Sequence, residues 1–307
     1  MINNPDKYEK ELIWRATRSV FETENYKHKP SGKKYKSHWT AFHHLAYIFG
    51  MFCKLFRIYE RGIKSAKNLQ INNMDFYFED LPPLFDNYTI LHLSDMHLDS
   101  LDDMYKIIAE KLKDLKYDLC ILTGDYRKET HGSYQQIIHP MEHIVKNISA
   151  PDGILAVLGN HDSYLMVDIF RKMNIKVLIN ETITIRRENQ EIDFTGIDDP
   201  FYYFTDRAYE ALEEELNQFK IALIHTPELY EITEKNNYKL YLCGHTHGGQ
   251  ICLPGNIPVI THFHGPNKFA RGRWKYKNMQ GYTNMGCGTV VLPIRFNAPC
   301  EIALIKL

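Results

Sequence analysis

Five short apolar segments of the sequence each lead directly into residues of the types that bind metal ions. The segments read YTILHLS, LCILT, ILAVL, IALI and YLC, and they precede, in turn, Asp95-Met96-His97, Gly124-Asp125, Gly159-Asn160-His161-Asp162, His225 and Gly244-His245-Thr246-His247. Short apolar runs bounded by polar residues are typical of buried strands. Side chains just past the carboxyl ends of strands converge on one crevice in an open α/β sheet. The fold must therefore bring these five strand ends together.

The segments between these strands indicate an α/β fold. Amphipathic stretches predict helices over Asp102–Leu115, Tyr134–Ile148, Tyr164–Met173 and Asp206–Asn217. Further strands are predicted at Thr182–Arg186, Asp193–Gly196, Tyr282–Met285 and Glu301–Ile305. Alternating strands and helices, followed by a β-rich C-terminal part, favour sheets covered by helices.

The residues at the strand ends have the donor groups of a site for two divalent metal ions. Imidazole and carboxylate together suit manganese, iron and zinc, and one amide oxygen fits a hard or borderline ion. No cysteine lies among them, which argues against a structural zinc site. The candidate ligands are too many for one four-coordinate ion, but they suit two ions about 3.5–4 Å apart that share a carboxylate. These candidates are Asp95, His97, Asp125, Asn160, His225, His245 and His247.

The series SDMH, GD, GNHD, H and GHTHGG, within roughly residues 90–307, resembles the signature of the calcineurin-like metallophosphoesterases. The resemblance implies a four-layer αββα sandwich, in which two mixed sheets face each other between helices. It also implies two ions, each with its own ligands, and a bridge at Asp125. One ion would be held by Asp95, His97 and His247, and the other by Asn160, His225 and His245. We expect Mn²⁺, with Fe, Zn or Mg as alternatives, and a hydroxide shared between the ions as nucleophile.

Three further residues are expected to act on the substrate or to support that action. The resemblance implies that His161 lies near the substrate without binding metal and that Asp162 orients it. As a cation, His161 would protonate the leaving oxygen or stabilise the phosphoryl charge. The segments HGGQICLP, GCG and PIRF resemble a bacterial membrane-associated branch of the family, which includes UDP-2,3-diacylglucosamine hydrolases of lipid A synthesis. On this resemblance, Arg295 is expected to bind the substrate's phosphate.

Residues 1–70 form a basic helical extension ahead of the catalytic domain, which we place at residues 71–307. The extension carries fourteen Lys or Arg against six Asp or Glu, a net charge of +8, whereas the whole chain has a net charge of −1. Within residues 41–70 the basic residues recur at helical spacing and form one stripe, with aromatic residues away from it. The stripe is Lys54, Arg57, Arg61, Lys64 and Lys67. This pattern is typical of a helix on an anionic membrane surface, and the alternative is a helix that packs on the domain with solvated lysines.

These features predict a metal-dependent phosphohydrolase that cleaves a phosphodiester or pyrophosphate bond in a membrane-associated, acylated substrate. The alternatives are a soluble phosphodiesterase or phosphatase of broad or nucleotide specificity, and a non-catalytic scaffold on the same fold. The complete ligand set counts against the scaffold. The N-terminal segment lacks the apolar core of a secretory signal, and the six cysteines form no C-x-x-C pair. We therefore expect a cytoplasmic protein, peripheral on the inner face of the cell membrane, and no nucleic-acid partner.

Overall fold

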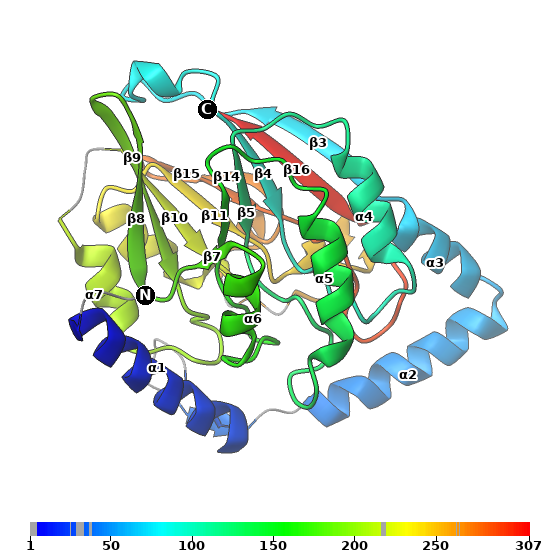
Figure 1. Ribbon diagram of the computed structural model, residues 1–307. Coiled ribbons are helices and arrows are strands. Elements are labelled where there is room, and N and C mark those ends of the chain that lie inside the picture. The colour runs from blue at the N-terminus through cyan, green and yellow to red at the C-terminus, as the bar shows by residue number, and fades with distance from the viewer. Residues whose placement is uncertain are drawn as a thin grey trace.

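The computed structural model describes residues 5–24, 26–28, 34–36, 39–215, 219–261, 263 and 265–307. At its centre are two six-stranded sheets (Figure 1). The first sheet contains, in spatial order, β3 (Gln70–Asp75), β16 (Glu301–Lys306), β4 (Thr89–Leu93), β5 (Leu119–Leu122), β6 (Ile154–Ala156) and β7 (Ile175–Val177). The second contains β14 (Gly272–Tyr276), β15 (Met279–Thr283), β11 (Leu240–Cys243), β10 (Lys220–Ile224), β9 (Gln190–Ile197) and β8 (Glu181–Arg187).

Both sheets are mixed. Strands β4 to β7 are parallel neighbours, whereas β16 pairs antiparallel with β4 and parallel with β3. In the second sheet β9, β10, β11 and β15 are parallel, and the edge strands β8 and β14 run antiparallel to their neighbours. Two small antiparallel pairs lie outside these sheets: β1 (Tyr26–His28) with β2 (Lys34–Lys36), and β12 (Cys252–Leu253) with β13 (Ile257–Pro258).

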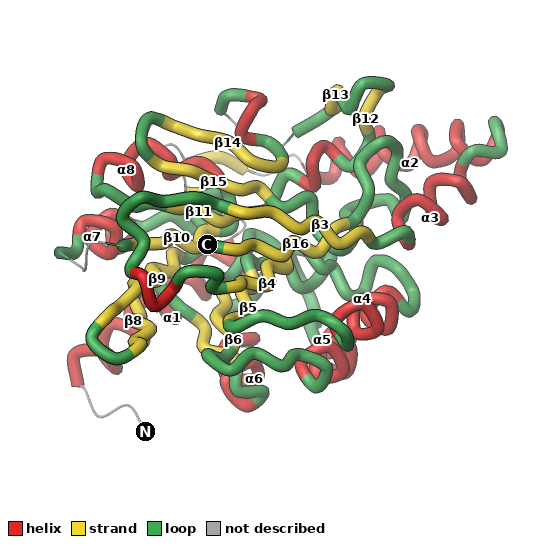
Figure 2. The backbone as a smooth tube through the Cα atoms, turned by 90° about the horizontal axis from the view of Figure 1, so that it is seen from above, coloured by secondary structure: helices red, strands yellow, loops and turns green. Residues whose placement is uncertain are grey.

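The strands place alternate side chains on opposite faces, and this alternation builds the layers. In β10, Ile221 and Leu223 pack between the two sheets, whereas Ala222 and Ile224 face helices. The first sheet is covered by α4 (Met104–Leu112), α5 (Ile138–Val145) and α6 (Met166–Lys172), and the second by α7 (Arg207–Glu213) and α8 (Tyr230–Lys235). Figure 2 shows the two sheets stacked between these helix layers. The predicted four-layer αββα sandwich is confirmed.

The differences from the predicted elements lie mainly at edges. Strand β3, with the sequence QINNMD, has no apolar run, because it is an edge strand with mostly half-buried residues. It begins at Gln70, so the extension leads directly into the first sheet. The predicted helix Tyr134–Ile148 is shorter, since its first turn is a 3₁₀ helix, Gln135–Ile137, and α5 follows.

Among the described residues of the basic extension there are three helices, α1 (Pro5–Glu24), α2 (Trp39–Leu55) and α3 (Tyr59–Lys67). The prediction of one helix carrying the whole basic stripe is wrong, because the chain turns between α2 and α3. Arg57 has a φ of 57°, and the N–H groups of Arg57 and Ile58 bond to the carbonyls of Lys54 and Cys53. This is the Schellman motif, which ends a helix with one left-handed residue. In the part of the chain that the structure describes, no helix is long and apolar enough to cross a membrane.

Candidate metal centre

The five predicted strand ends meet at one edge of the sandwich. Strands β4, β5 and β6 of the first sheet lead into Asp95-Met96-His97, Gly124-Asp125 and Gly159 to Asp162, and strands β10 and β11 of the second lead into His225 and Gly244 to His247. Asp95, His97, Asp125, His245 and His247 all have positive φ, a strained conformation for non-glycine residues that is concentrated at functional sites. A Cβ at Gly159 would lie 2.2 Å from Oδ1 of Asp125, so glycine is needed there.

One group of ligand atoms comes from Asp95, His97 and His247. Their ligand atoms lie within 4.8 Å of one another, and all three side chains are buried. The Nε2 atoms of His97 and His247 are 3.1 Å apart, and Nε2 of His247 is 3.5 Å from Oδ1 of Asp95. Nδ1 of His97 lies 2.7 Å from the carbonyl oxygen of Arg127, to which it donates. That bond leaves the Nε2 lone pair for an ion.

A second group comes from Asp125, His225 and His245, with Asn160 beside them. Its three titratable side chains also have ligand atoms within 4.8 Å of one another. Nε2 of His225 is 3.1 Å from Oδ1 of Asn160 and 3.3 Å from Oδ2 of Asp125. Nδ1 of His225 donates to the carbonyl of Thr123 at 2.6 Å, which again directs the Nε2 lone pair to the centre.

Asp125 lies between the two groups. Its Oδ2 is 3.3 Å from Nε2 of His225 in one group and 3.8 Å from Nε2 of His97 in the other. Burial, opposed by His225 and reinforced by Asp125, raises the pKa of Asp95 to about 7. Two buried carboxylates that raise each other's pKa are kept ionised by a bound cation. The donor set and its geometry therefore fit two divalent ions with Asp125 between them.

His161 points to the same centre but its expected charge is not supported. Its Nε2 is 3.9 Å from Oδ2 of Asp125, and its Nδ1 contacts the carbonyl oxygen of Lys128. Burial, opposed by Asp125, lowers the pKa of His161 to about 3. The ring is therefore neutral at neutral pH, with its proton on Nδ1 and an acceptor lone pair on Nε2. The geometry favours His161 as a proton acceptor, in contrast to the predicted cation.

The prediction that Asp162 orients His161 is not supported by its contacts. The Asp162 carboxylate accepts hydrogen bonds from the backbone N–H groups of Gly159 at 2.7 Å, Asp125 at 2.8 Å and Tyr126 at 2.9 Å. It therefore joins the turn after β5 to the turn after β6. The contact that orients the His161 ring comes from the Lys128 carbonyl instead.

Arg295 is fully buried, and its surroundings contradict a direct contact with phosphate. Its guanidinium donates to the backbone carbonyls of Gly288, His247, Ala298 and Met285, and Nη2 also lies 3.1 Å from Nδ1 of His247. These contacts occupy all five N–H groups of the side chain. Arg295 therefore holds the loop behind His247.

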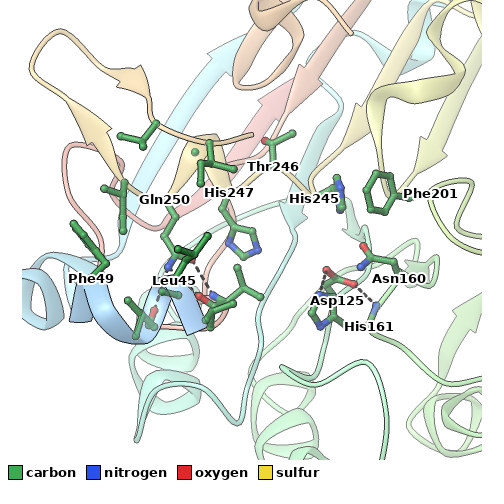
Figure 3. A pocket seen from close by; sticks show the side chains of 18 of the residues that line it. Leu45, Phe49, Asp125, Asn160, His161, Phe201, His245, Thr246, His247 and Gln250 are labelled. Atoms are coloured by element: carbon green, nitrogen blue, oxygen red, sulfur yellow. Dashed lines mark hydrogen bonds and ion pairs between the residues drawn. The ribbon is translucent and has the colours of Figure 1, made fainter. Parts of the chain in front are cut away.

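A pocket of about 300 Å³ opens onto this centre (Figure 3). One end is lined by metal-site residues: Asp125, Asn160, His161, His245 and His247. The rest is almost entirely apolar, with Leu45, Ala46 and Phe49 of α2, Phe201, Tyr202, Ile251, Val259, Ile260 and the segment Val290 to Leu292. Figure 3 shows Leu45 and Phe49 facing the pocket from α2. The extension thus supplies one wall of the candidate active site.

Several supporting residues were not predicted from the sequence. Asp198 and Asp199 are buried directly after β9, and the strand-end pattern that reveals the metal ligands applies to them as well. Burial, opposed by His225 and Arg18, raises the pKa of Asp199 to about 6. Trp14 and Arg18 of α1 are buried beside Asp198, and no local pattern marks them.

Several known proteins resemble this chain. Residues 88–249 match the family model described as calcineurin-like phosphoesterase. An uncharacterized metallophosphoesterase of Bacillus subtilis, YkuE, is 30% identical over 241 residues, which cover 74% of this chain and 81% of the relative. Phosphodiesterase YaeI of Escherichia coli is 24% identical over 240 residues, or 72% of this chain and 82% of YaeI. A putative 5'-nucleotidase structure from Staphylococcus aureus aligns at 15% identity and a TM-score of 0.43, over 66% of this chain and 49% of that one.

The family match covers more than half of the chain, and all seven candidate metal ligands, from Asp95 to His247, lie within it. Together with the paired His and Asp groups, it identifies a metal-dependent hydrolase of phosphoric esters or anhydrides. The chain belongs to the calcineurin-like phosphoesterase family.

Proposed function

We propose that the protein hydrolyses a phosphodiester or pyrophosphate bond in an acylated substrate, such as UDP-2,3-diacylglucosamine, at the surface of an anionic membrane. The observation that carries this proposal is the pocket, which joins the metal ligands to an apolar wall built partly from α2. A nucleotide or another small soluble diester would leave that wall unused. Acyl chains would cover it and leave water, which is favourable by about 25 cal/mol for each Å² buried.

The outer face of α2 supports the membrane part of the proposal. Large apolar side chains are exposed along it and at its end: Tyr47, Ile48, Met51, Phe52, Leu55 and Phe56. Exposed apolar patches of this kind mark membrane or protein contacts. Lys54, Arg57, Arg61 and Lys64 are exposed nearby on α2, α3 and the turn between them. Each basic residue near an anionic leaflet contributes about 1 kcal/mol.

In the proposed hydrolysis, the metal ligands, His161 and the apolar wall of the pocket would have separate roles. Two bound divalent ions, Mn²⁺ in our proposal, would supply hydroxide at neutral pH and neutralise charge on the phosphoryl group. His161 would accept at Nε2 the proton that the attacking water loses, and would pass it to the leaving oxygen. The apolar wall would exclude water around the acyl chains, while the phosphate lies at the metal end.

The test compares an acylated and a soluble substrate in pocket variants. The double variant Leu45→Glu/Ile260→Glu changes two exposed pocket residues. Its kcat/KM for UDP-2,3-diacylglucosamine should fall at least tenfold, since charge in an acyl site costs several kcal/mol, whereas kcat/KM for bis-p-nitrophenyl phosphate should change less than twofold. Leu84→Glu, an exposed leucine outside the pocket lining, is the matched control. Equal effects on both substrates, or no hydrolysis of the acylated one, would favour the soluble phosphodiesterase.

Membrane association is tested separately by sedimentation with vesicles. The wild-type protein should sediment with phosphatidylglycerol vesicles at low salt, and Ile48→Glu/Phe52→Glu should weaken this without changing hydrolysis of the soluble diester. Point variants suit this test better than deletion of the extension, because Trp14 and Arg18 of α1 are buried in the catalytic domain. If the wild-type protein stays in the supernatant, the proposal that it associates with an anionic membrane is wrong.

A further inference from the structure

Arg18 of α1 is fully buried against the loop that carries Asn160 and His161. Its Nη2 donates to the carbonyl oxygens of Gly159 at 3.1 Å and Asp162 at 3.0 Å. These two carbonyls flank Asn160 and His161 on either side. Arg18 therefore fixes the backbone of Asn160, a candidate metal ligand, and of His161, which lies next to the metal centre.

The same guanidinium connects this loop to the second sheet. Its Nη1 pairs with Oδ1 of Asp198, and Nε1 of Trp14 donates to Oδ2 of Asp198 at 2.6 Å. Asp198 directly follows β9 of the second sheet, whereas Gly159 follows β6 of the first. The two groups of metal ligands contain residues from both sheets, so α1 spans the junction on which the metal centre depends.

Two further side chains complete this contact. The Tyr203 ring lies 3.5 Å from the Arg18 guanidinium carbon, and its hydroxyl donates to the Asn160 carbonyl at 3.4 Å. Glu22 of α1 accepts hydrogen bonds from Oγ of Ser163 at 2.8 Å, from N of Tyr164 at 3.0 Å and from Nε of Arg18. The backbone from residue 159 to 164 is therefore held at four points by α1 and its partner Tyr203.

We propose that α1 is a structural brace for the metal centre, with Arg18 as the positioning residue that sets the ligand geometry of Asn160. The inference goes beyond the proposed function, because it depends on the two-metal site and not on the substrate. Its chemistry requires arginine: only a planar fork reaches two carbonyls and a carboxylate at once, whereas a lysine ammonium is a point charge. Within the described part of the chain, Arg18 bonds to Glu22, Asp198, Gly159 and Asp162 and not to Asp95, His97 or His247, so the brace acts on one metal position.

The test measures the affinity of each metal position in Arg18→Lys. Lysine keeps the charge beside Asp198 but loses the fork. Titration with Mn²⁺, followed by electron paramagnetic resonance, should show one ion bound as in the wild type and the second bound about 10- to 100-fold more weakly, the usual effect of losing an outer contact to a ligand. The spin-coupled spectrum of the metal pair should be replaced by that of a single Mn²⁺ at concentrations that saturate the wild type.

Two further variants keep the result interpretable. Arg15→Gln removes an arginine one turn away on α1, which pairs with Glu11 and Asp168 and does not contact residues 159–162, and it should bind both ions normally. Arg18→Met/Asp198→Asn removes both buried charges together, and it should show the same selective loss if Arg18→Lys folds poorly. Normal binding of both ions in the Arg18 variants, or equal weakening of both positions, would overturn the proposal.

Discussion

Arg295 provides a sharp test of how the metal centre is held, because sequence and structure give it different roles. Its five N–H groups are spent on four backbone carbonyls inside a fully buried site, and its Nη2 lies 3.1 Å from Nδ1 of His247. Lysine has only three N–H groups from a single nitrogen, so Arg295→Lys must leave one or two carbonyls unpaired. At roughly 1–3 kcal/mol for each unpaired buried group, the free energy of unfolding should fall by about 2–4 kcal/mol.

Urea unfolding of the metal-loaded protein measures this change, together with KM and kcat for a soluble diester. Because Arg295 also contacts His247, the variant should bind one Mn²⁺ more weakly, and metal-saturated KM should stay close to the wild-type value. The matched control is Arg186→Lys, whose side chain is exposed and pairs with Glu191 at the surface; it should change the unfolding free energy by less than about 0.5 kcal/mol. A stable Arg295→Lys protein with a strongly raised KM would refute this reasoning and restore a direct phosphate contact.

Three other outcomes are expected. Asp125→Ala should lose bound metal and turnover together, because the Asp125 carboxylate lies between the two ligand groups. Metal analysis and a diesterase assay measure these two losses. Full metal occupancy with a near-normal rate would contradict the prediction. His161→Ala should keep both ions but lower kcat by about 10²–10⁴, the usual range for an acid–base group, and a loss below threefold would reject the role. Burial lowers the pKa of His92 to about 3, whereas the pKa in the unfolded chain is near 6.5. The unfolded chain therefore binds a proton at His92 below pH 6.5 while the folded chain does not, so the free energy of unfolding falls as the pH drops below 6.5. Between pH 7 and pH 5 the wild type should therefore lose about 2 kcal/mol more than His92→Gln in urea unfolding, and parallel pH profiles would contradict this.

The candidate metal ligands could be predicted from the sequence because the signal for each of them is local. A buried parallel strand is a short apolar run, and a ligand must follow it directly to reach the common edge of the sheets. Asp95, Asp125, Asn160, His225 and His245 all carry this signal, and all five lie together in the structure. The layered fold follows from the same runs, because alternate residues in strands such as β10 face opposite layers.

The roles of Arg18, Asp162 and Arg295 depended on the tertiary structure. Each bonds mainly to backbone carbonyls or N–H groups of distant segments, and every residue type except proline offers both groups. No pattern of side chains can therefore show which loop an arginine will hold. The turn at Arg57 is similar: the basic spacing continues through it, and the helix ends because the packed chain places a left-handed residue there. Sequence determined which candidate ligand groups follow the strands, whereas long-range backbone contacts decided what holds them in place.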